Sequence, residues 1–162
     1  MSTSPAHIRS AAVRDALEAA GIEHELIEHE PTFRADDEAR AVDEPLDVVA
    51  KIVVLRDGDA RILALVSAFD RIDLHRVRET LGAGHSLRLA TEEEIAADFP
   101  EFEVGAVSPI GHLTAVELVD SHLLEPERIV CPAGDHTHAV RLAPADLVKA
   151  TGARVARISV DD

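Results

Sequence analysis

A lysine inside an apolar segment is the first residue whose type and position could do chemistry. Lys51 interrupts the run of residues 48–55 and is one of two lysines in the chain, the other being Lys149. Burial of an ammonium group is costly, so this lysine needs an anion, a carbonyl or a catalytic task. The alternative is a stem that packs along the core while the ammonium reaches solvent. The strand alone leaves both interpretations open.

A loop framed by glycine and proline is the second candidate, Gly105-Ala106-Val107-Ser108-Pro109. Glycine allows the backbone to approach a ligand closely, and proline fixes the exit without an amide hydrogen of its own. The amides of Ala106, Val107 and Ser108 are therefore candidate donors to an oxyanion. An ordinary tight turn is the alternative. Ser108 lacks the Gly-x-Ser-x-Gly context of a nucleophile.

Two histidines, His136 and His138, lie beside Asp135 and could suggest a metal site. A His-x-His pair on a strand places both rings on one face. Zinc sites need three or four ligands, however, and no second His/Cys cluster is evident, so we expect no metal. We expect one histidine to line a pocket and orient water or substrate. A solvated turn is an equally open alternative.

For three further residues the sequence predicts a structural position or role. Cys131 lies in an apolar strand and is expected to be buried and inert. Asp120 is expected to cap the turn that follows it. His112 follows the Gly/Pro loop and is expected to be exposed.

Short helices and strands alternate along the chain. Apolar periodicity and turn residues predict helices at 8–20, before Pro45, at 73–81, from Thr91 and at 145–150. They predict strands at 24–27, 48–55, 61–66, 86–89, 114–119, 128–131, 138–142 and 154–160. The expected fold class is α/β (α+β): one compact domain over residues 1–162, with helices around a mixed, largely antiparallel or barrel-like sheet.

Composition excludes several classes of protein. The net charge of −15 and the absence of Trp and Tyr argue against general DNA or RNA binding, although a local basic rim could hold one RNA end. A single cysteine excludes an internal disulfide and fits a reducing cytosol. No signal peptide and no apolar stretch of about 20 residues is visible. We expect a cytoplasmic protein that does not bind membranes.

With these elements in order, the chain resembles the YbaK/ProX family of aminoacyl-tRNA editing domains, which hydrolyse amino acids wrongly esterified to tRNA. The matching segments span nearly the whole chain in family order: Ala50-Lys51-Ile52-Val53-Val54-Leu55 before an Asp-Gly turn, the Gly-x-x-x-Pro loop at 105–109, Val119-Asp120, and Ala143-Pro144-Ala145-Asp146-Leu147. One departure is Arg34, where many relatives carry a small hydroxyl residue after Pro31-Thr32-Phe33.

The resemblance implies a YbaK-like fold and a hydrolase that needs no metal and no organic cofactor. It implies that Lys51 binds the terminal adenosine phosphate or the ester carbonyl, and that the segment around Arg34 lines the aminoacyl pocket. We therefore assign catalysis to Lys51, Gly105, Ala106, Val107 and Ser108, and substrate binding to Phe33, Arg34, Pro109, His136 and His138.

The leading hypothesis is a free-standing hydrolase that deacylates mischarged tRNA, in particular a tRNA charged by prolyl-tRNA synthetase. The amino acid would be small, such as alanine, cysteine or serine. The 3′ end of the aminoacyl-tRNA would be the ligand, and the synthetase a possible partner. The alternative is a non-catalytic binding module that recognises an aminoacyl-adenosine-like ligand or a synthetase, and turnover separates the two. A third hypothesis, a metal-dependent hydrolase built on the histidines, predicts loss of activity on chelation.

Overall fold

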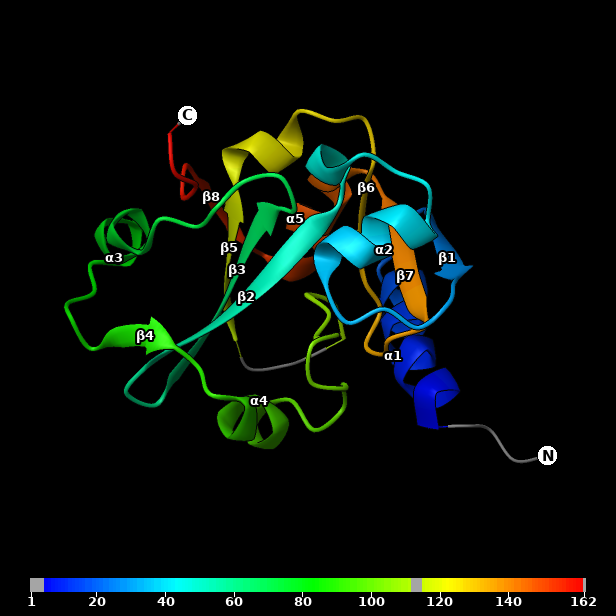
Figure 1. The fold of residues 1–162 in the computed structure, drawn as a ribbon, viewed down its shortest axis with the longest axis horizontal. Coiled ribbons are helices and arrows are strands. Elements are labelled where there is room, and N and C mark those ends of the chain that lie inside the picture. The colour runs from blue at the N-terminus through cyan, green and yellow to red at the C-terminus, as the bar shows by residue number, and fades with distance from the viewer. Residues whose placement is uncertain (1–4, 112–114, 162) are drawn as a thin grey trace.

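The computed structural model of the chain describes residues 5–111 and 115–161, and Figure 1 shows the arrangement of its elements. Its α-helices are α1 (Pro5–Ala19), α2 (Ala35–Ala41), α3 (Leu74–Leu81), α4 (Glu92–Asp98) and α5 (Pro144–Thr151), with 3-10 helices η1 (Leu46–Val48) and η2 (Ser121–Leu124). Its strands are β1 (His24–Glu28), β2 (Ala50–Asp57), β3 (Ala60–Ser67), β4 (Leu87–Leu89), β5 (Val116–Asp120), β6 (Ile129–Pro132), β7 (His138–Leu142) and β8 (Arg154–Ala156). His112 lies outside the described residues.

The described strands form two sheets. The larger has the order β4-β2-β3-β5-β8, in which β2 is antiparallel to β3 and β4 while β5 is parallel to β3 and β8. The smaller has the order β1-β7-β6 and is antiparallel throughout. The expected mixed, largely antiparallel α/β architecture is confirmed, and the strands described here do not close into a barrel.

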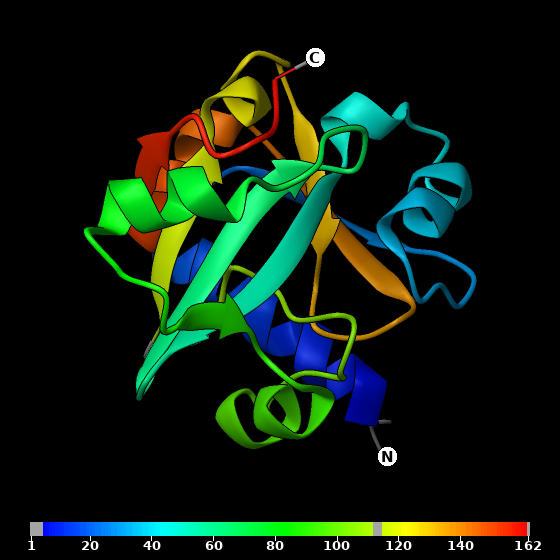
Figure 2. The same cartoon turned by 60° about the vertical axis from the view of Figure 1, so that its left-hand side comes forward.

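The hairpin of β2 and β3 divides the hydrophobic core. Its strands pair in register from Ala50 opposite Ser67 to Asp57 opposite Ala60. Because side chains alternate between the faces of a strand, even-numbered residues of β2 join the cluster with α1, α5 and the smaller sheet. Odd-numbered residues face the cluster that includes Val77 of α3. Figure 2 shows α1 and α3 on opposite sides of the hairpin.

Helix α2 packs on the smaller sheet. Ala39 of α2, Val49, Val130 of β6 and Ala139 of β7 are buried together in a third apolar cluster. In Figure 1 α2 accordingly lies beside β7, across from β2. This packing buries Glu38, in the first turn of α2, beside the β2 residues of the larger sheet.

Helix α4 begins as the sequence predicts. Thr91 and Glu94 form a capping box, in which the Thr91 hydroxyl accepts a hydrogen bond from the Glu94 amide and the Glu94 carboxylate accepts one from the Thr91 amide. This start directs Ile95, on the next turn, toward the space beside β2.

The structure corrects the ends of two predicted strands. Val48 belongs to η1 because its amide donates to the carbonyl of Pro45, so β2 begins at Ala50. Strand β8 ends at Ala156, because the amides of Ile158 and Ser159 donate to the carboxylate of Asp120 instead of a strand.

Asp120 therefore has a different role from the expected turn cap, since its side chain makes no cap hydrogen bond to η2. It is fully buried, and it accepts from Ile158 N at 2.8 Å, Ser159 N at 3.1 Å and Ser159 Oγ at 3.0 Å. These bonds fasten the C-terminal segment to the end of β5.

None of the helices in the described part of the chain is long and apolar enough to cross a membrane.

We expect Asp120→Asn to lower the free energy of unfolding by roughly 2 kcal/mol, because an amide group would present a donor to buried N–H groups that need an acceptor. Urea denaturation measures this. Asp15→Asn is the control, since the Asp15 side chain is 67% exposed and its change should stay within about 0.5 kcal/mol. An unchanged unfolding midpoint in Asp120→Asn would show that the three bonds do not hold the C-terminal segment.

Candidate functional site

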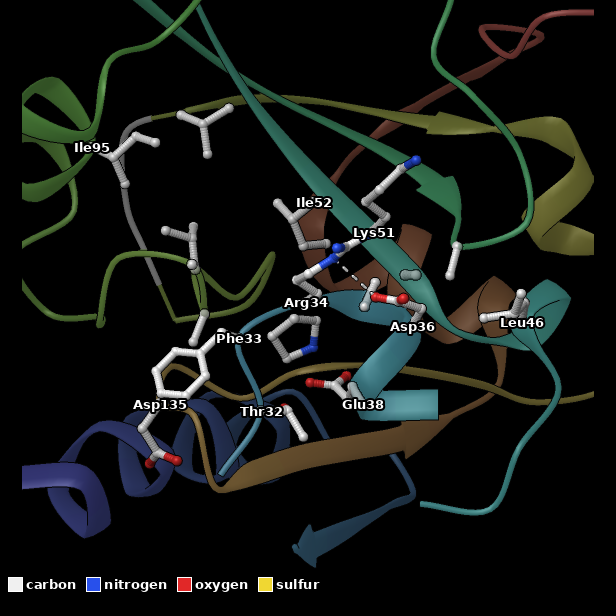
Figure 3. A pocket seen from close by; sticks show the side chains of 18 residues that line it. Thr32, Phe33, Arg34, Asp36, Glu38, Leu46, Lys51, Ile52, Ile95 and Asp135 are labelled. Atoms are coloured by element: carbon white, nitrogen blue, oxygen red, sulfur yellow. Dashed lines mark ion pairs between the residues drawn. The ribbon is translucent and has the colours of Figure 1, made fainter. Parts of the chain in front are cut away.

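A cavity of about 550 Å³ lies between α2, β2 and the loop at Gly105. Its wall is built from four separate parts of the chain, with Ile95 of α4 and Leu46 of η1 at the side. The first part is residues 32–38 without Asp37. The second is the β2–β3 hairpin, which contributes Ala50, Lys51, Ile52, Val54 and, just after β3, Ala68. The third is residues 105–107, and the fourth is Pro132 with Asp135. Figure 3 shows these side chains around the cavity.

Gly105 occupies a position that only glycine fills without strain. Its φ of +88° lies in the left-handed region, and a Cβ atom there would be 3.2 Å from Cε1 of His136 and 3.8 Å from the carbonyl oxygen of Phe33. Gly105→Ala would therefore strain the fold as well as the site, so this variant cannot separate catalysis from stability.

The amides that follow Gly105 are not equivalent. The Ala106 amide donates to the Glu103 carbonyl at 2.9 Å and is engaged within the loop. The amides of Val107 and Ser108 have no hydrogen-bond partner among the described residues. Ala106 and Val107 line the cavity. Val107 thus combines a place on the cavity wall with an amide that has no hydrogen-bond partner among the residues described.

Ser108 and Pro109 are buried behind the loop and are not part of the cavity wall. The Ser108 hydroxyl accepts a hydrogen bond from the Ile110 amide at 3.2 Å, which fixes the exit of the loop. The side chains of both residues therefore shape the loop from behind.

Lys51 contributes to the cavity wall, but its ammonium group points elsewhere. Nζ donates to the backbone carbonyl of Asp70 at 2.9 Å. In Figure 3 the side chain leaves β2 on the side away from Glu38 and Asp135. Burial lowers the pKa of Lys51, the Asp70 carboxylate opposes this effect, and Arg71 adds to it. The ammonium group thus has a carbonyl partner at the edge of the strand.

His136 joins the two loops that bound the cavity. Its Nδ1 donates to the carbonyl of Thr32 at 2.8 Å, and its ring centroid lies 4.5 Å from that of Phe33. Its Nε2 is 3.6 Å from the Glu103 carboxylate. His136 lies in the turn before β7, so it does not share a strand face with His138.

His138 is buried away from the cavity wall. Its Nδ1 bonds the Asp135 carboxylate at 2.9 Å, and its Nε2 is 3.4 Å from the carboxylate of Glu28. The same Asp135 oxygen accepts from the amide and hydroxyl of Thr137. Asp135 lines the cavity, but its Oδ1 already accepts hydrogen bonds from residues of its own turn.

Phe33 and Arg34 stand at the rim. The Phe33 side chain is 68% exposed, and the Arg34 guanidinium pairs with Asp36 at 3.2 Å. Exposed residues with a ring and a charge could contact the base or the phosphate of a nucleotide end.

One group of three potential metal ligands is found among the described residues, and it does not include His136 or His138. It consists of Asp70, Asp120 and His122, outside the cavity. Asp120 already accepts three hydrogen bonds from the protein, and Asp70 accepts from Ser67 and contacts His122. These internal bonds account for the group without an ion.

Glu38 is the cavity residue that the sequence analysis missed. It is buried, its Oε1 has no hydrogen-bond partner among the described residues, and its Oε2 is 4.0 Å from Nε2 of His29. Burial raises the pKa of this carboxyl to about 8. A signal was present, because Ala35, Ala39 and Val42 form an apolar stripe next to Glu38 on α2.

Comparisons with known proteins identify the family of this chain. The chain belongs to the aminoacyl-tRNA editing domain family, whose model matches residues 29–150. This match includes every residue of the cavity wall and confirms the resemblance to the YbaK/ProX family.

A curated relative is the prolyl-tRNA editing protein ProX of Acetoanaerobium sticklandii. It is 30% identical over 151 residues, which cover 87% of this chain and 91% of that protein. A crystal structure described as a proposed trans-editing enzyme for prolyl tRNA synthetase is 30% identical and superposes with a TM-score of 0.86, covering 99% of this chain and 100% of that one. The structure of a hypothetical protein, 24% identical, has a TM-score of 0.85 over 92% of this chain and 99% of that one, and supports the fold alone.

Glu38→Gln should stabilise the protein more at pH 8 than at pH 5. A carboxyl with a folded pKa of about 8 and an ordinary value of 4.5 holds its proton longer in the folded state, so its contribution to stability falls as pH rises between these values. Glutamine does not ionise, so the variant avoids this loss of unfolding free energy, which amounts to at most roughly 4 kcal/mol between pH 5 and pH 8. Urea denaturation at both pH values measures the difference.

The control is Asp37→Asn on the same helix, where the carboxylate pairs with Arg40 on the surface. Asp37→Asn should change the free energy of unfolding by the same amount at pH 5 and at pH 8. A Glu38→Gln effect that is equally independent of pH would show that Glu38 is ionised in the folded protein.

Proposed function

We propose that this editing hydrolase releases a small amino acid from the 3′ end of a mischarged tRNA, acting in trans on a tRNA charged by prolyl-tRNA synthetase. Membership of the editing family supports the reaction class. The names of two relatives, a prolyl-tRNA editing protein and a proposed trans-editing enzyme for prolyl tRNA synthetase, support the choice of tRNA. The synthetase is a possible partner that holds the tRNA.

The observation that carries the proposal is that Val107 lines the cavity and that its amide has no hydrogen-bond partner in the described part of the chain. When water attacks an ester carbonyl, negative charge develops on the carbonyl oxygen. A backbone amide held in place can stabilise that charge by about 3 kcal/mol. The positive φ of Gly105, with His136 packed against it, fixes the path of the backbone into Ala106 and Val107. An aminoacyl ester is already labile, so positioned water and such a donor are sufficient chemistry.

The size and lining of the cavity support a small aminoacyl group attached to a ribose. A volume of about 550 Å³ lies within the range of about 300–1,000 Å³ typical of ligand sites. Ala50, Ile52, Val54 and Ile95 give part of the wall an apolar surface. Water would reach the ester beside His136, whose ring is held in place by the hydrogen bond from Nδ1 to the Thr32 carbonyl.

Lys51 has the role of a positive charge at the cavity edge. Its ammonium group, held by the Asp70 carbonyl, would attract the phosphate of the terminal nucleotide while Phe33 and Arg34 contact the same end of the substrate. A flexible four-carbon stem allows the ammonium group to exchange the carbonyl for a phosphate oxygen. This role requires no proton transfer by Lys51.

A non-catalytic module with the same fold is the second candidate, because the cavity would also bind an aminoacyl-adenosine-like ligand without turnover. The decisive experiment is a panel of mischarged tRNAs incubated with substoichiometric protein. Release of many equivalents of free amino acid supports the hydrolase. Binding without release from any member of the panel would support the module.

Lys51→Ala should reduce the deacylation rate more than tenfold, because the substrate phosphate loses its cationic partner. Lys149→Ala, which removes the other lysine of the chain from the exposed face of α5, is the matched control and should leave the rate unchanged. Circular dichroism checks that both variants fold. A Lys51→Ala rate within about twofold of wild type would remove this residue from the mechanism.

A further inference from the structure

We propose that Glu38 binds the α-ammonium group of the aminoacyl ester and so restricts the site to substrates with a free amine. The inference rests on the proposed function, because it states which part of that substrate meets α2. The specificity of the site would then depend on the α-amine, which all amino acids share.

The position of the Glu38 carboxyl group supports this role. The residue is 6% exposed, it lines the cavity, and its Oε1 has no hydrogen-bond partner in residues 5–111 and 115–161. Figure 3 shows the carboxyl group directed into the cavity. A buried oxygen without a partner is costly, and a ligand that donates to it removes the cost.

The other charged groups of the described cavity wall already have partners. The ammonium group of Lys51 donates to the Asp70 carbonyl, and Arg34 pairs with Asp36. Asp135 accepts from its own turn. Among the charged side chains of this wall, Glu38 is therefore the one that keeps an oxygen, Oε1, without a hydrogen-bond partner in the described part of the chain.

The charge of Glu38 can adapt to the ligand. Because burial raises the pKa of this carboxyl to about 8, it is protonated in the empty cavity at pH 7 and carries no buried charge. An arriving ammonium group favours the ionised form. The proton has an acceptor nearby, because Nδ1 of His29 donates to the Glu30 carbonyl at 2.7 Å and leaves the lone pair of Nε2, 4.0 Å from Glu38, free in the neutral ring.

An ammonium group is the part of an aminoacyl ester that fits this site best. It is a cation with several donors, it lies one carbon from the scissile carbonyl, and it is present whatever the side chain. Esters of hydroxy acids and esters with an acylated amine lack this charge. The cavity would therefore discriminate against both classes, including tRNA that carries a peptide.

Two amide-linked analogues that resist hydrolysis test the inference by calorimetry. They are 3′-alanylamino-3′-deoxyadenosine and its propionyl counterpart, which differ only in the amine. Wild-type protein should bind the alanyl compound about ten- to a hundredfold more tightly, as expected for a hydrogen bond to a charged group. Glu38→Gln should bind both within about twofold. Asp37→Asn, which removes a charge from the outer face of α2, should keep the wild-type preference.

A second measurement follows the carboxyl directly. The ¹³C signal of the Glu38 carboxyl should move to the ionised position on binding of the alanyl compound and not the propionyl one, and a purely structural glutamate would not respond in this way. Equal binding of both compounds by wild type, or an unchanged preference in Glu38→Gln, would overturn the inference and leave the proposed function standing. If neither compound binds to wild-type protein, the proposed function and the inference fail together.

Discussion

The register between β2 and β3 decides which side chains reach the cavity. Ala50 pairs with Ser67 and the ladder continues without a bulge to Asp57, so alternate residues of β2 face the cavity and the α3 side. A shift by one residue would exchange the two faces, sending Lys51 into the cavity and Ile52 out of the core. Both hydrophobic clusters of the larger sheet depend on this pairing, which the turn at Gly58 fixes.

The cavity also depends on contacts between segments that are far apart in the chain. His136 bonds the carbonyl of Thr32 and stands against Gly105, so it holds the segment before α2 beside the Gly/Pro loop. Helix α2 is anchored to the smaller sheet through Ala39. Together these contacts bring Glu38 and Val107 to the wall of one cavity, where we propose that an ester and its adjacent amine meet both.

Local patterns in the sequence predicted much of this arrangement. The Lys51 strand, the strand that follows it and the helix start at Thr91 are set by neighbouring residues, and each was expected near its place. What the sequence could not show depends on tertiary contacts. The carbonyl that receives Lys51 and the burial of Glu38 arise from segments brought together by the fold. The bond that occupies the Ala106 amide is local, but a sequence pattern does not reveal it.

The central claim is that the aminoacyl end of the substrate lies in the cavity between α2 and the Gly105 loop. A crystal structure of the protein with 3′-alanylamino-3′-deoxyadenosine tests this most directly. The account predicts the alanyl carbonyl within hydrogen-bond distance of the Val107 amide and the ammonium group on Glu38. An analogue bound instead in the separate cleft beside Asp70 and His122, with the Gly105 cavity empty, would contradict it.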